Sequence, residues 1–334
     1  MNGGQPSGRP AEDALQPAAP EPGPAVAAGF AADRERPSTN VPIFIVGAPR
    51  SGTTMLRLML NAHPRIAIPF ESDFIPKFYR RIGEYGDLHE RQNIARLLHD
   101  IAAQQFVKRG GLVRDMAAVL AWNPESYDGL IDAIYKTYAA ANGKRRWGDK
   151  DPDNEVELDV LWKLFPGCRF VHIVRDGRGA ANSLRKQEWG SKNLLKLARE
   201  WSWRVTLARK MGMMLGPKYY LEVRYEDLVC SPESSLRHIC DFVGEAFDPE
   251  MLEYYKNAAA AMPESSLKFH SSSIRAPDPA KATAWQHEMT VVDRMLFEEV
   301  AGATLEEFGY RLEAFRGDWR SDLMRLKYAL INRW

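Results

Sequence analysis

The sequence lacks the features that mark several specialised classes of protein. It has three cysteines, Cys168, Cys230 and Cys240, with no CxxC spacing, which excludes a disulfide scaffold and a cysteine-based metal module. This sparse, odd-numbered set is typical of a reducing compartment, so we expect a cytoplasmic protein. No apolar run approaches the roughly 18 residues that span a bilayer, and the chain does not open with a basic start and an apolar segment. We therefore expect neither a transmembrane anchor nor a secretory signal.

A strong net charge is also missing. The 334-residue chain carries 45 basic and 44 acidic side chains, so its formal charge of +1 creates no global field that would draw it onto nucleic acid. We therefore predict no nucleic-acid partner, and any recognition of a charged ligand must come from a local cluster. The chain does have 45% hydrophobic residues, enough for the core of one large α/β domain or two smaller domains.

The two ends of the chain differ in composition from the middle. Residues 1–40 are rich in Ala, Pro and Gly with one aromatic side chain, which predicts a disordered tail before a domain at 41–316. Residues 317–334 predict an amphipathic helix with an apolar face made by Trp319, Leu323, Leu326 and Leu330. Packing on the domain, on a second copy in a homodimer or on a membrane surface would each cover that face, and the sequence leaves the three open.

Between the ends, short apolar runs alternate with helical patterns. Strands are predicted at 41–47, 65–69, 168–174 and 219–223. Helices are predicted at 55–60, 177–187, 193–214, 233–243, 249–260 and 290–308, with a long helical insertion at 74–141 and a mobile loop at 263–282. This order predicts an α/β fold in three layers, with a central parallel sheet covered by helices on both faces.

The segment after the first strand has the form of a phosphate-binding loop. Gly47 and Gly52 give the spacing G-x-x-x-x-G between a strand and a helix, where backbone N–H groups and the helix dipole bind phosphate. A Walker A loop would continue with a lysine for the terminal phosphates of a nucleoside triphosphate, but Thr53 follows Gly52. The cation has moved inside the loop, to Arg50. We therefore predict a P-loop-type fold that holds a phosphate group without the usual lysine.

Residues 47–64 resemble the 5′-phosphosulfate loop of the sulfotransferases that use 3′-phosphoadenosine 5′-phosphosulfate. Within that family they look most like the tyrosylprotein sulfotransferases and the bacterial enzymes with an arginine in the loop. The resemblance implies that this phosphosulfate is the sulfuryl donor. It also implies that the 5′-phosphosulfate is held by Arg50, Ser51, Gly52, Thr53 and Thr54.

A second block, residues 169–183, supplies a strand-end Arg175 and, eight residues later, Ser183. A charged fork and a short hydroxyl donor can converge on one anion, although Arg175 could instead form a surface ion pair with Asp176. In the family these two positions bind the 3′-phosphate, which distinguishes the donor from ATP. Two further matches imply that Tyr225 lies near the nucleotide, if it is not an ordinary strand-end tyrosine, and that Lys281 clamps it.

Sulfuryl transfer needs a positioned hydroxyl, a base for its proton and cations for the developing negative charge, but in principle no metal. Glu71 follows the second predicted strand, so in a parallel sheet it lies at the edge that carries the phosphate loop. The tyrosylprotein branch has its catalytic base at this place. The resemblance therefore implies that Glu71 is the base, with Asp73 as the near alternative. The non-catalytic alternative is that Glu71 is a solvated carboxylate in a loop.

The remaining polar candidates lie further along the chain. Lys150 matches the branch's Lys-Asp-Pro segment, which implies that it stabilises the transferred group together with Arg50; pairing with Asp149 or Asp151 in a turn is the alternative. The branch also places a serine near the reaction centre, and the candidates here are Ser271, Ser272 and Ser273.

Histidine is the base in cytosolic sulfotransferases generally. We identify His63 as the only histidine near the predicted loops, and it is a poor candidate because it lies at the far end of the first helix. His172, inside a predicted strand, is expected to be a buried structural residue.

Together these features predict a sulfotransferase that works by in-line transfer with a glutamate base. The acceptor is a hydroxyl of a small molecule, lipid, saccharide or tyrosine, and the insertion at 74–141 is expected to shape its cleft. One alternative is a P-loop kinase, which would need a magnesium-binding acid at a strand end, where Asp176 is the one candidate. The other is a nucleotide-binding protein without catalysis.

Overall fold

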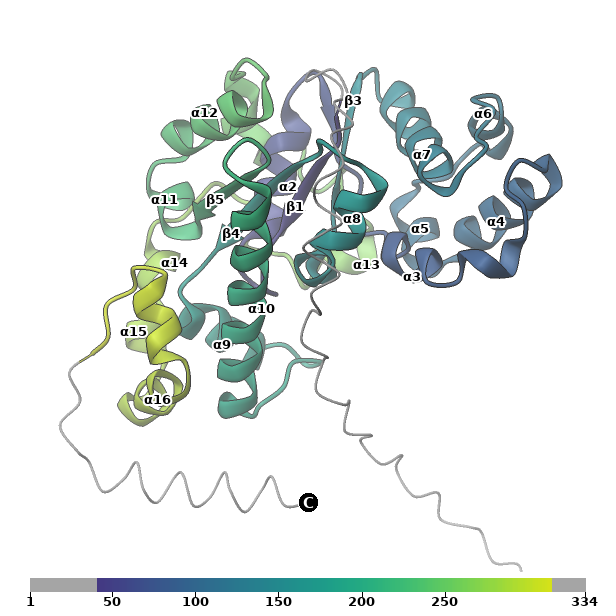
Figure 1. Cartoon of the computed structure of the whole chain (residues 1–334). Coiled ribbons are helices and arrows are strands. Elements are labelled where there is room, and N and C mark those ends of the chain that lie inside the picture. The colour runs from purple at the N-terminus through teal and green to yellow at the C-terminus, as the bar shows by residue number, and fades with distance from the viewer. Residues whose placement is uncertain (1–40, 314–334) are drawn as a thin grey trace, which may run out of the picture.

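The computed structural model of the chain describes residues 41–313 (Figure 1). The predicted tail at 1–40, the last residues of the predicted domain and the predicted amphipathic helix at 317–334 lie outside the described residues. These boundaries therefore stay predictions.

A five-stranded parallel sheet forms the centre of the molecule, with the strand order β2-β3-β1-β4-β5. The strands are β1 (Ile43–Val46), β2 (Ile66–Ala67), β3 (Arg146–Lys150), β4 (Arg169–Val174) and β5 (Tyr220–Arg224). All four predicted strands are present, and the predicted α/β class with a central parallel sheet is confirmed.

The strand β3 was not predicted, although it pairs with both β1 and β2. Its sequence, RWGDK, has no apolar run, yet all of its residues are buried. Polar partners make this burial possible: Arg146 pairs with Glu245 at 3.2 Å, and Asp149 accepts a hydrogen bond from the Tyr135 hydroxyl at 2.7 Å. The strand is stable because the fold satisfies its charges, which a local pattern does not reveal.

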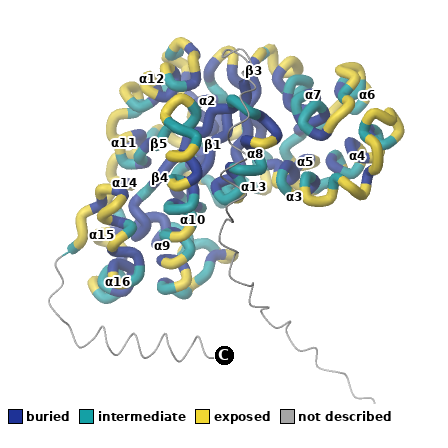
Figure 2. The backbone as a smooth tube through the Cα atoms, viewed as in Figure 1, coloured by how far each residue is buried: buried dark blue, intermediate teal, exposed yellow. Residues whose placement is uncertain are grey.

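Two helical layers cover the sheet because successive residues of β1 point to opposite faces. Ile43 and Ile45 pack on one side with α2 (Thr53–Ala62), α11 (Tyr225–Cys230) and α12 (Pro232–Val243). Phe44 and Val46 pack on the other side with α7 (Tyr127–Ala141), α8 (Leu158–Leu164) and α10 (Leu194–Leu215). Figure 2 shows the buried strands between these layers, and the predicted three-layer arrangement is confirmed.

The helical insertion follows β2 and precedes β3 in the chain, and Figure 1 shows it to the right of the sheet. It consists of α3 (Ile75–Tyr79), the 3₁₀ helix η2 (Ile82–Tyr85), α4 (Arg91–Ala103), α5 (Gln105–Gly110), α6 (Met116–Leu120) and α7. Its apolar side chains, among them Leu97 and Ile131, belong to the same core cluster as Phe44 of the sheet. The insertion therefore extends the core of the domain.

The remaining helices of the described chain lie outside the sheet, and the last of them are at the lower left of Figure 1. These helices are η3 (Pro152–Val156), α9 (Gly177–Arg185), η4 (Pro249–Lys256), α13 (Glu264–Leu267), α14 (Ala280–Thr283), α15 (Trp285–Glu288) and α16 (Val291–Glu307). The predicted loop at 263–282 thus contains one short helix and the start of another. The Tyr254 hydroxyl bonds the carbonyl of Arg275 within it.

Candidate active site

A cavity of about 480 Å³ opens at the carboxyl ends of the strands. In a parallel sheet the segments that follow the strands meet at this edge, so residues far apart in the sequence come together there. The predicted site residues that line the cavity are Arg50, Gly52, Thr53, Thr54, Glu71, Arg175, Ser183, Tyr225 and Lys281. Within the described part of the chain, no residue of the insertion 74–141 lines it, so the acceptor role of the insertion stays a prediction.

The phosphate loop leaves backbone donors open toward the cavity. Gly52 precedes α2 with φ 97°, and a Cβ atom there would lie 2.5 Å from the Tyr225 ring, so glycine alone fits. No described side chain caps α2, which leaves the N–H groups of its first turn for an anion. Ser51, also predicted in the loop, is fully buried, and its hydroxyl has no partner among the described residues.

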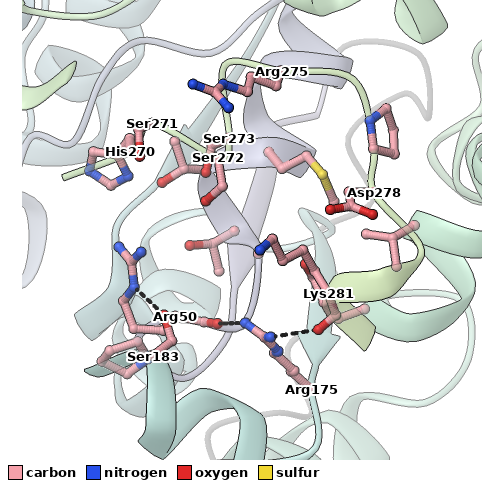
Figure 3. A pocket seen from close by; sticks show the side chains of 18 of the residues that line it. Arg50, Arg175, Ser183, His270, Ser271, Ser272, Ser273, Arg275, Asp278 and Lys281 are labelled. Atoms are coloured by element: carbon pink, nitrogen blue, oxygen red, sulfur yellow. Dashed lines mark hydrogen bonds between the residues drawn. The ribbon is translucent and has the colours of Figure 1, made fainter. Parts of the chain in front are cut away.

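Two arginines lie at this loop, and the Arg175 guanidinium reaches the backbone carbonyl of Arg50 (Figure 3). Arg50 donates from Nε to the Ser183 hydroxyl at 3.1 Å, and Arg175 donates from Nη1 to the Arg50 carbonyl at 3.0 Å and from Nη2 to the Lys281 carbonyl at 3.0 Å. Arg175 also stacks on Tyr225, 4.3 Å from the ring centroid. Burial and the charge of Arg175 lower the pKa of Arg50. Neither arginine has a carboxylate partner among the described residues, so the pair favours an incoming anion.

The alternative for Arg175, a surface ion pair with Asp176, is not formed. The Asp176 carboxylate instead accepts hydrogen bonds from Arg178 Nε at 2.9 Å and Nη2 at 2.6 Å. Because Asp176 faces Arg178, the Arg175 guanidinium is free to face the cavity. Arg175 and Ser183 both line the cavity, and their binding of one phosphate stays a prediction.

A second group of charges lies deeper, where β3 ends. Lys150 is fully buried and forms an ion pair with Glu71, and its Nζ lies 3.4 Å from the Thr54 hydroxyl. The alternative of a turn pair with Asp149 or Asp151 is wrong, because Lys150 is the last residue of a strand and points to Glu71. Thr54 belongs to the phosphate loop, so this pair joins the two parts of the site.

The charge state of Glu71 follows from this pairing. Burial by itself would raise its pKa, but the attraction of Lys150 and the hydrogen bond from it outweigh burial, and the net pKa lies below the ordinary value. Glu71 is therefore ionised at neutral pH. Asp73 is exposed and does not line the cavity, so it is not placed as an alternative base in this structure.

A neighbouring carboxyl behaves in the opposite way. Burial raises the pKa of Asp151 to about 8, and the nearby charges of Glu71 and Asp149 add to this shift. Its oxygens accept hydrogen bonds from the backbone N–H groups of Asp73 at 3.1 Å and Asp153 at 3.0 Å. Asp151 therefore fixes the loop that follows Glu71.

The histidine assignment needs a correction. His63 is buried and bonds the Ala246 carbonyl at 2.9 Å, away from the cavity, but His270 lines the cavity, so the interpretation that His63 is the only histidine near the site is wrong. Sequence reasoning missed His270 because it lies 199 residues after Glu71 in a segment without periodicity. The one available signal was its position directly before the three candidate serines, all of which line the cavity. His172 is buried against Glu155 and Tyr220, as predicted.

Comparison with known proteins decides the family. Residues 42–249, more than half of the chain, match the sulfotransferase family. The chain belongs to that family.

Individual sulfotransferases are distant relatives. The chain is 25% identical over 242 residues to protein-tyrosine sulfotransferase A of Caenorhabditis elegans, covering 70% of this chain and 58% of the relative. It is 27% identical over 295 residues to nodulation protein NoeE of Sinorhizobium fredii, covering 80% of this chain and 65% of the relative. The chain thus spans less than two thirds of the length of either relative.

Solved structures support the sulfotransferase fold. The sulfotransferase domain from the Synechococcus PCC 7002 olefin synthase superimposes with a TM-score of 0.57 at 23% identity, over 84% of this chain and 99% of that domain. The sulfotransferase domain from the curacin biosynthetic pathway also gives 0.57, at 19% identity over 82% of this chain and 99% of that domain. At these identities the likeness establishes the fold alone.

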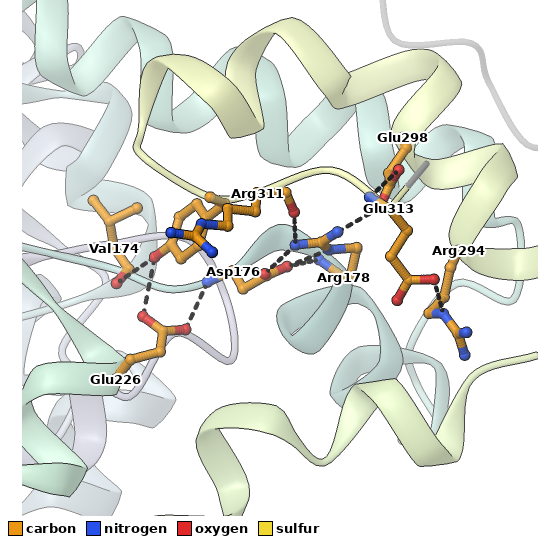
Figure 4. A network of polar contacts seen from close by, with 9 residues as sticks. Val174, Asp176, Arg178, Glu226, Arg294, Glu298, Arg311 and Glu313 are labelled. Atoms are coloured by element: carbon orange, nitrogen blue, oxygen red, sulfur yellow. Dashed lines mark hydrogen bonds and ion pairs between the residues drawn. The ribbon is translucent and has the colours of Figure 1, made fainter. Parts of the chain in front are cut away.

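In this sulfotransferase-family chain, a buried network holds the turn that carries Arg175 (Figure 4). Arg178 binds both oxygens of Asp176, pairs with Glu298 of α16 and donates to the Arg311 carbonyl at 3.0 Å. The network connects the start of α9 with the end of the described chain. It positions the strand-end Arg175 without touching the cavity.

Replacing Arg178 with Ala is expected to lower the free energy of unfolding by about 3–5 kcal/mol, because it leaves Asp176 and Glu298 as buried charges without their partner. Chemical denaturation of the full chain measures this loss. Arg237→Ala is the matched control, since Arg237 forms an exposed pair with Glu233 and should contribute about 0–1 kcal/mol. Equal losses in the two variants would contradict the structural role of the network.

Proposed function

We propose that this chain transfers a sulfuryl group from 3′-phosphoadenosine 5′-phosphosulfate to an acceptor hydroxyl. One observation carries the proposal: a single cavity joins an uncapped helix N-terminus, two arginines without described carboxylate partners and Glu71, whose partner Lys150 is buried behind the cavity lining. The first two features suit the two phosphate positions of the donor, and the third suits the transfer itself. Membership of the sulfotransferase family supports this reading.

In the proposed complex, the 5′-phosphosulfate lies on residues 50–54, at the first turn of α2. Arg175 and Ser183 bind the 3′-phosphate, and Tyr225 and Lys281 border the nucleotide, because all four line the same cavity as the loop. The Arg175 guanidinium already stacks on Tyr225, which fixes its plane for a bidentate contact with phosphate.

In the proposed reaction, Glu71 accepts the proton of the acceptor hydroxyl while the oxygen attacks sulfur in line with the leaving group. The new O–S bond forms as the S–O bond to the 5′-phosphate breaks, and adenosine 3′,5′-bisphosphate leaves. Protonation removes the charge of Glu71, so the Lys150 ammonium loses its partner and becomes available to the negative oxygens. Arg50 stabilises the same charge from the loop side.

The proposal does not specify the acceptor class, the cellular location or the oligomeric state. Relatives named protein-tyrosine sulfotransferases favour a tyrosine hydroxyl, while a small molecule, lipid or saccharide remains compatible with the cavity. Metal independence, a cytoplasmic location and a homodimer stay predictions from the sequence. Among the helices of residues 41–313, none combines the length and the hydropathy that a transmembrane span requires. Incubation with labelled donor and fractionated lysate would identify the acceptor class.

The structure does not meet the main requirement of the kinase alternative. It needs a strand-end carboxylate that can hold magnesium, and Asp176 has both oxygens bound by Arg178. The non-catalytic alternative shares the donor site and differs only in turnover, so an activity measurement separates it from the proposal.

The test of the donor site is calorimetry with adenosine 3′,5′-bisphosphate and ATP, with and without a chelator. The bisphosphate is expected to bind more tightly than ATP and without magnesium. Arg175→Ala should weaken it by roughly 10-fold to 150-fold, because charge-assisted hydrogen bonds worth about 1.5–3 kcal/mol are lost. The exposed Arg237→Ala serves as the control, with unchanged affinity. Tighter, magnesium-dependent binding of ATP would overturn the proposal.

A further inference from the structure

His270, the residue that sequence reasoning missed, lines the cavity. The His270 imidazole packs edge-on against Phe70, with 6.3 Å between the ring centroids, and Phe70 directly precedes Glu71. The adjacent Phe269 carbonyl accepts a hydrogen bond from Arg50 Nη1 at 3.1 Å. His270 therefore lies near both Glu71 and Arg50, on the wall of the cavity, and Figure 3 shows it beside Arg50.

The surroundings keep this imidazole neutral. Burial lowers its pKa to about 4, the charges of Lys150, Arg50 and Arg57 act in the same direction, and only Glu71 opposes them. A neutral imidazole has one N–H donor and one acceptor nitrogen, and neither has a hydrogen-bond partner among the described residues. A polar ring with open hydrogen-bonding capacity beside the reaction centre is suited to contact a substrate.

We propose that His270 is a further catalytic residue, which donates its N–H to the acceptor oxygen and aims that oxygen at sulfur. The inference rests on the proposed function. A hydroxyl oxygen has one proton and two lone pairs. If the proton goes to Glu71 and one lone pair accepts from His270, the remaining lone pair is directed at the sulfuryl group. The two side chains together then set the line of attack, and His270 exchanges no proton.

The alternative is that His270 itself removes the proton. The resulting imidazolium would lie among Lys150, Arg50 and Arg57, and this like-charge repulsion opposes protonation. Protonation of Glu71, by contrast, creates no new charge. The positions of the cations therefore favour Glu71 as the base and leave His270 as the orienting donor.

The test compares the turnover of three variants of the full chain. Each is assayed with labelled donor and an acceptor that the wild-type chain sulfates. His270→Phe keeps a ring but has no donor, and should lower the acceptor kcat/KM on the order of 10²-fold. His270→Asn and His270→Gln each place an amide N–H near the position of one of the two imidazole nitrogens. Neither amide is a base. At least one of them should recover tenfold or more of that loss. The affinity for bisphosphate, measured by calorimetry, should stay at the wild-type value in all three.

Three outcomes would overturn the inference. Full activity of His270→Phe would show that the ring contacts nothing in the reaction, and amide variants as inactive as His270→Phe would make His270 the base. A parallel loss of bisphosphate affinity in all variants would reveal a structural role. His287→Phe, an exposed histidine outside the cavity lining, is the control and should keep full activity. Failure of the wild-type chain to bind bisphosphate or transfer sulfuryl groups would instead refute the proposed function.

Discussion

Replacing Glu71 with Gln is expected to lower turnover by about 10²-fold to 10⁴-fold, the usual range for loss of a general base. Donor binding should persist, because Glu71 follows β2 and contacts Lys150, whereas the phosphate groups are assigned to other segments. The amide keeps the shape of the side chain. Turnover with labelled donor and calorimetry with adenosine 3′,5′-bisphosphate measure the two quantities separately.

Asp73→Asn is the matched control for this variant, and it should keep near-wild-type turnover because Asp73 is exposed outside the cavity. If Asp73→Asn abolished turnover while Glu71→Gln did not, the base would be Asp73. An equal loss of turnover and bisphosphate affinity in Glu71→Gln would mean that Glu71 holds the loop in place. Either result would refute the catalytic role given to Glu71.

Replacing Lys150 with Met is expected to lower turnover on the order of 10²-fold to 10³-fold. The reason is that the variant lacks one preorganised cation for the sulfuryl oxygens. The variant should also change the pH dependence. Lys150 holds the pKa of Glu71 below its ordinary value, and without it burial outweighs the weaker effects of His270 and Arg57. The folded-state pKa of Glu71 then rises, so the acidic limb of kcat/KM against pH should move to higher pH.

Lys150→Arg is the companion variant, since it keeps a charge near Glu71 and should hold the acidic limb close to its wild-type position. The exposed Lys196→Met tests for general effects of losing a lysine. The wild-type ion pair also stabilises the fold. Because the folded-state pKa of Glu71 is depressed, this contribution is present above the unfolded pKa and is lost as the pH falls through the folded one. An unmoved acidic limb in Lys150→Met would contradict the pairing.

The sequence by itself determined the strands that are apolar and the loops that follow them. The short apolar runs of β1 and β4 predict buried strands from the local sequence alone. The phosphate loop is likewise predicted by a local spacing of glycines between a strand and a helix. Arg175 and Ser183 could be predicted together because both follow β4, Arg175 directly after the strand and Ser183 on the short helix α9. Parallel strands bring such segments to one edge, so local patterns predict that these residues lie near one another, while their phosphate-binding roles are implied by the family resemblance.

Only the tertiary structure decided which polar residues are buried and which distant segment completes the cavity. The strand β3 has no apolar signal, because its burial depends on partners such as Tyr135 and Glu245 that other parts of the chain supply. His270 reaches the site through a segment without periodicity, held there by the bond from Arg50 to the Phe269 carbonyl. Local periodicity reports which face of an element is apolar, but long-range hydrogen bonds and ion pairs form only when the chain has folded, and they place β3 and His270.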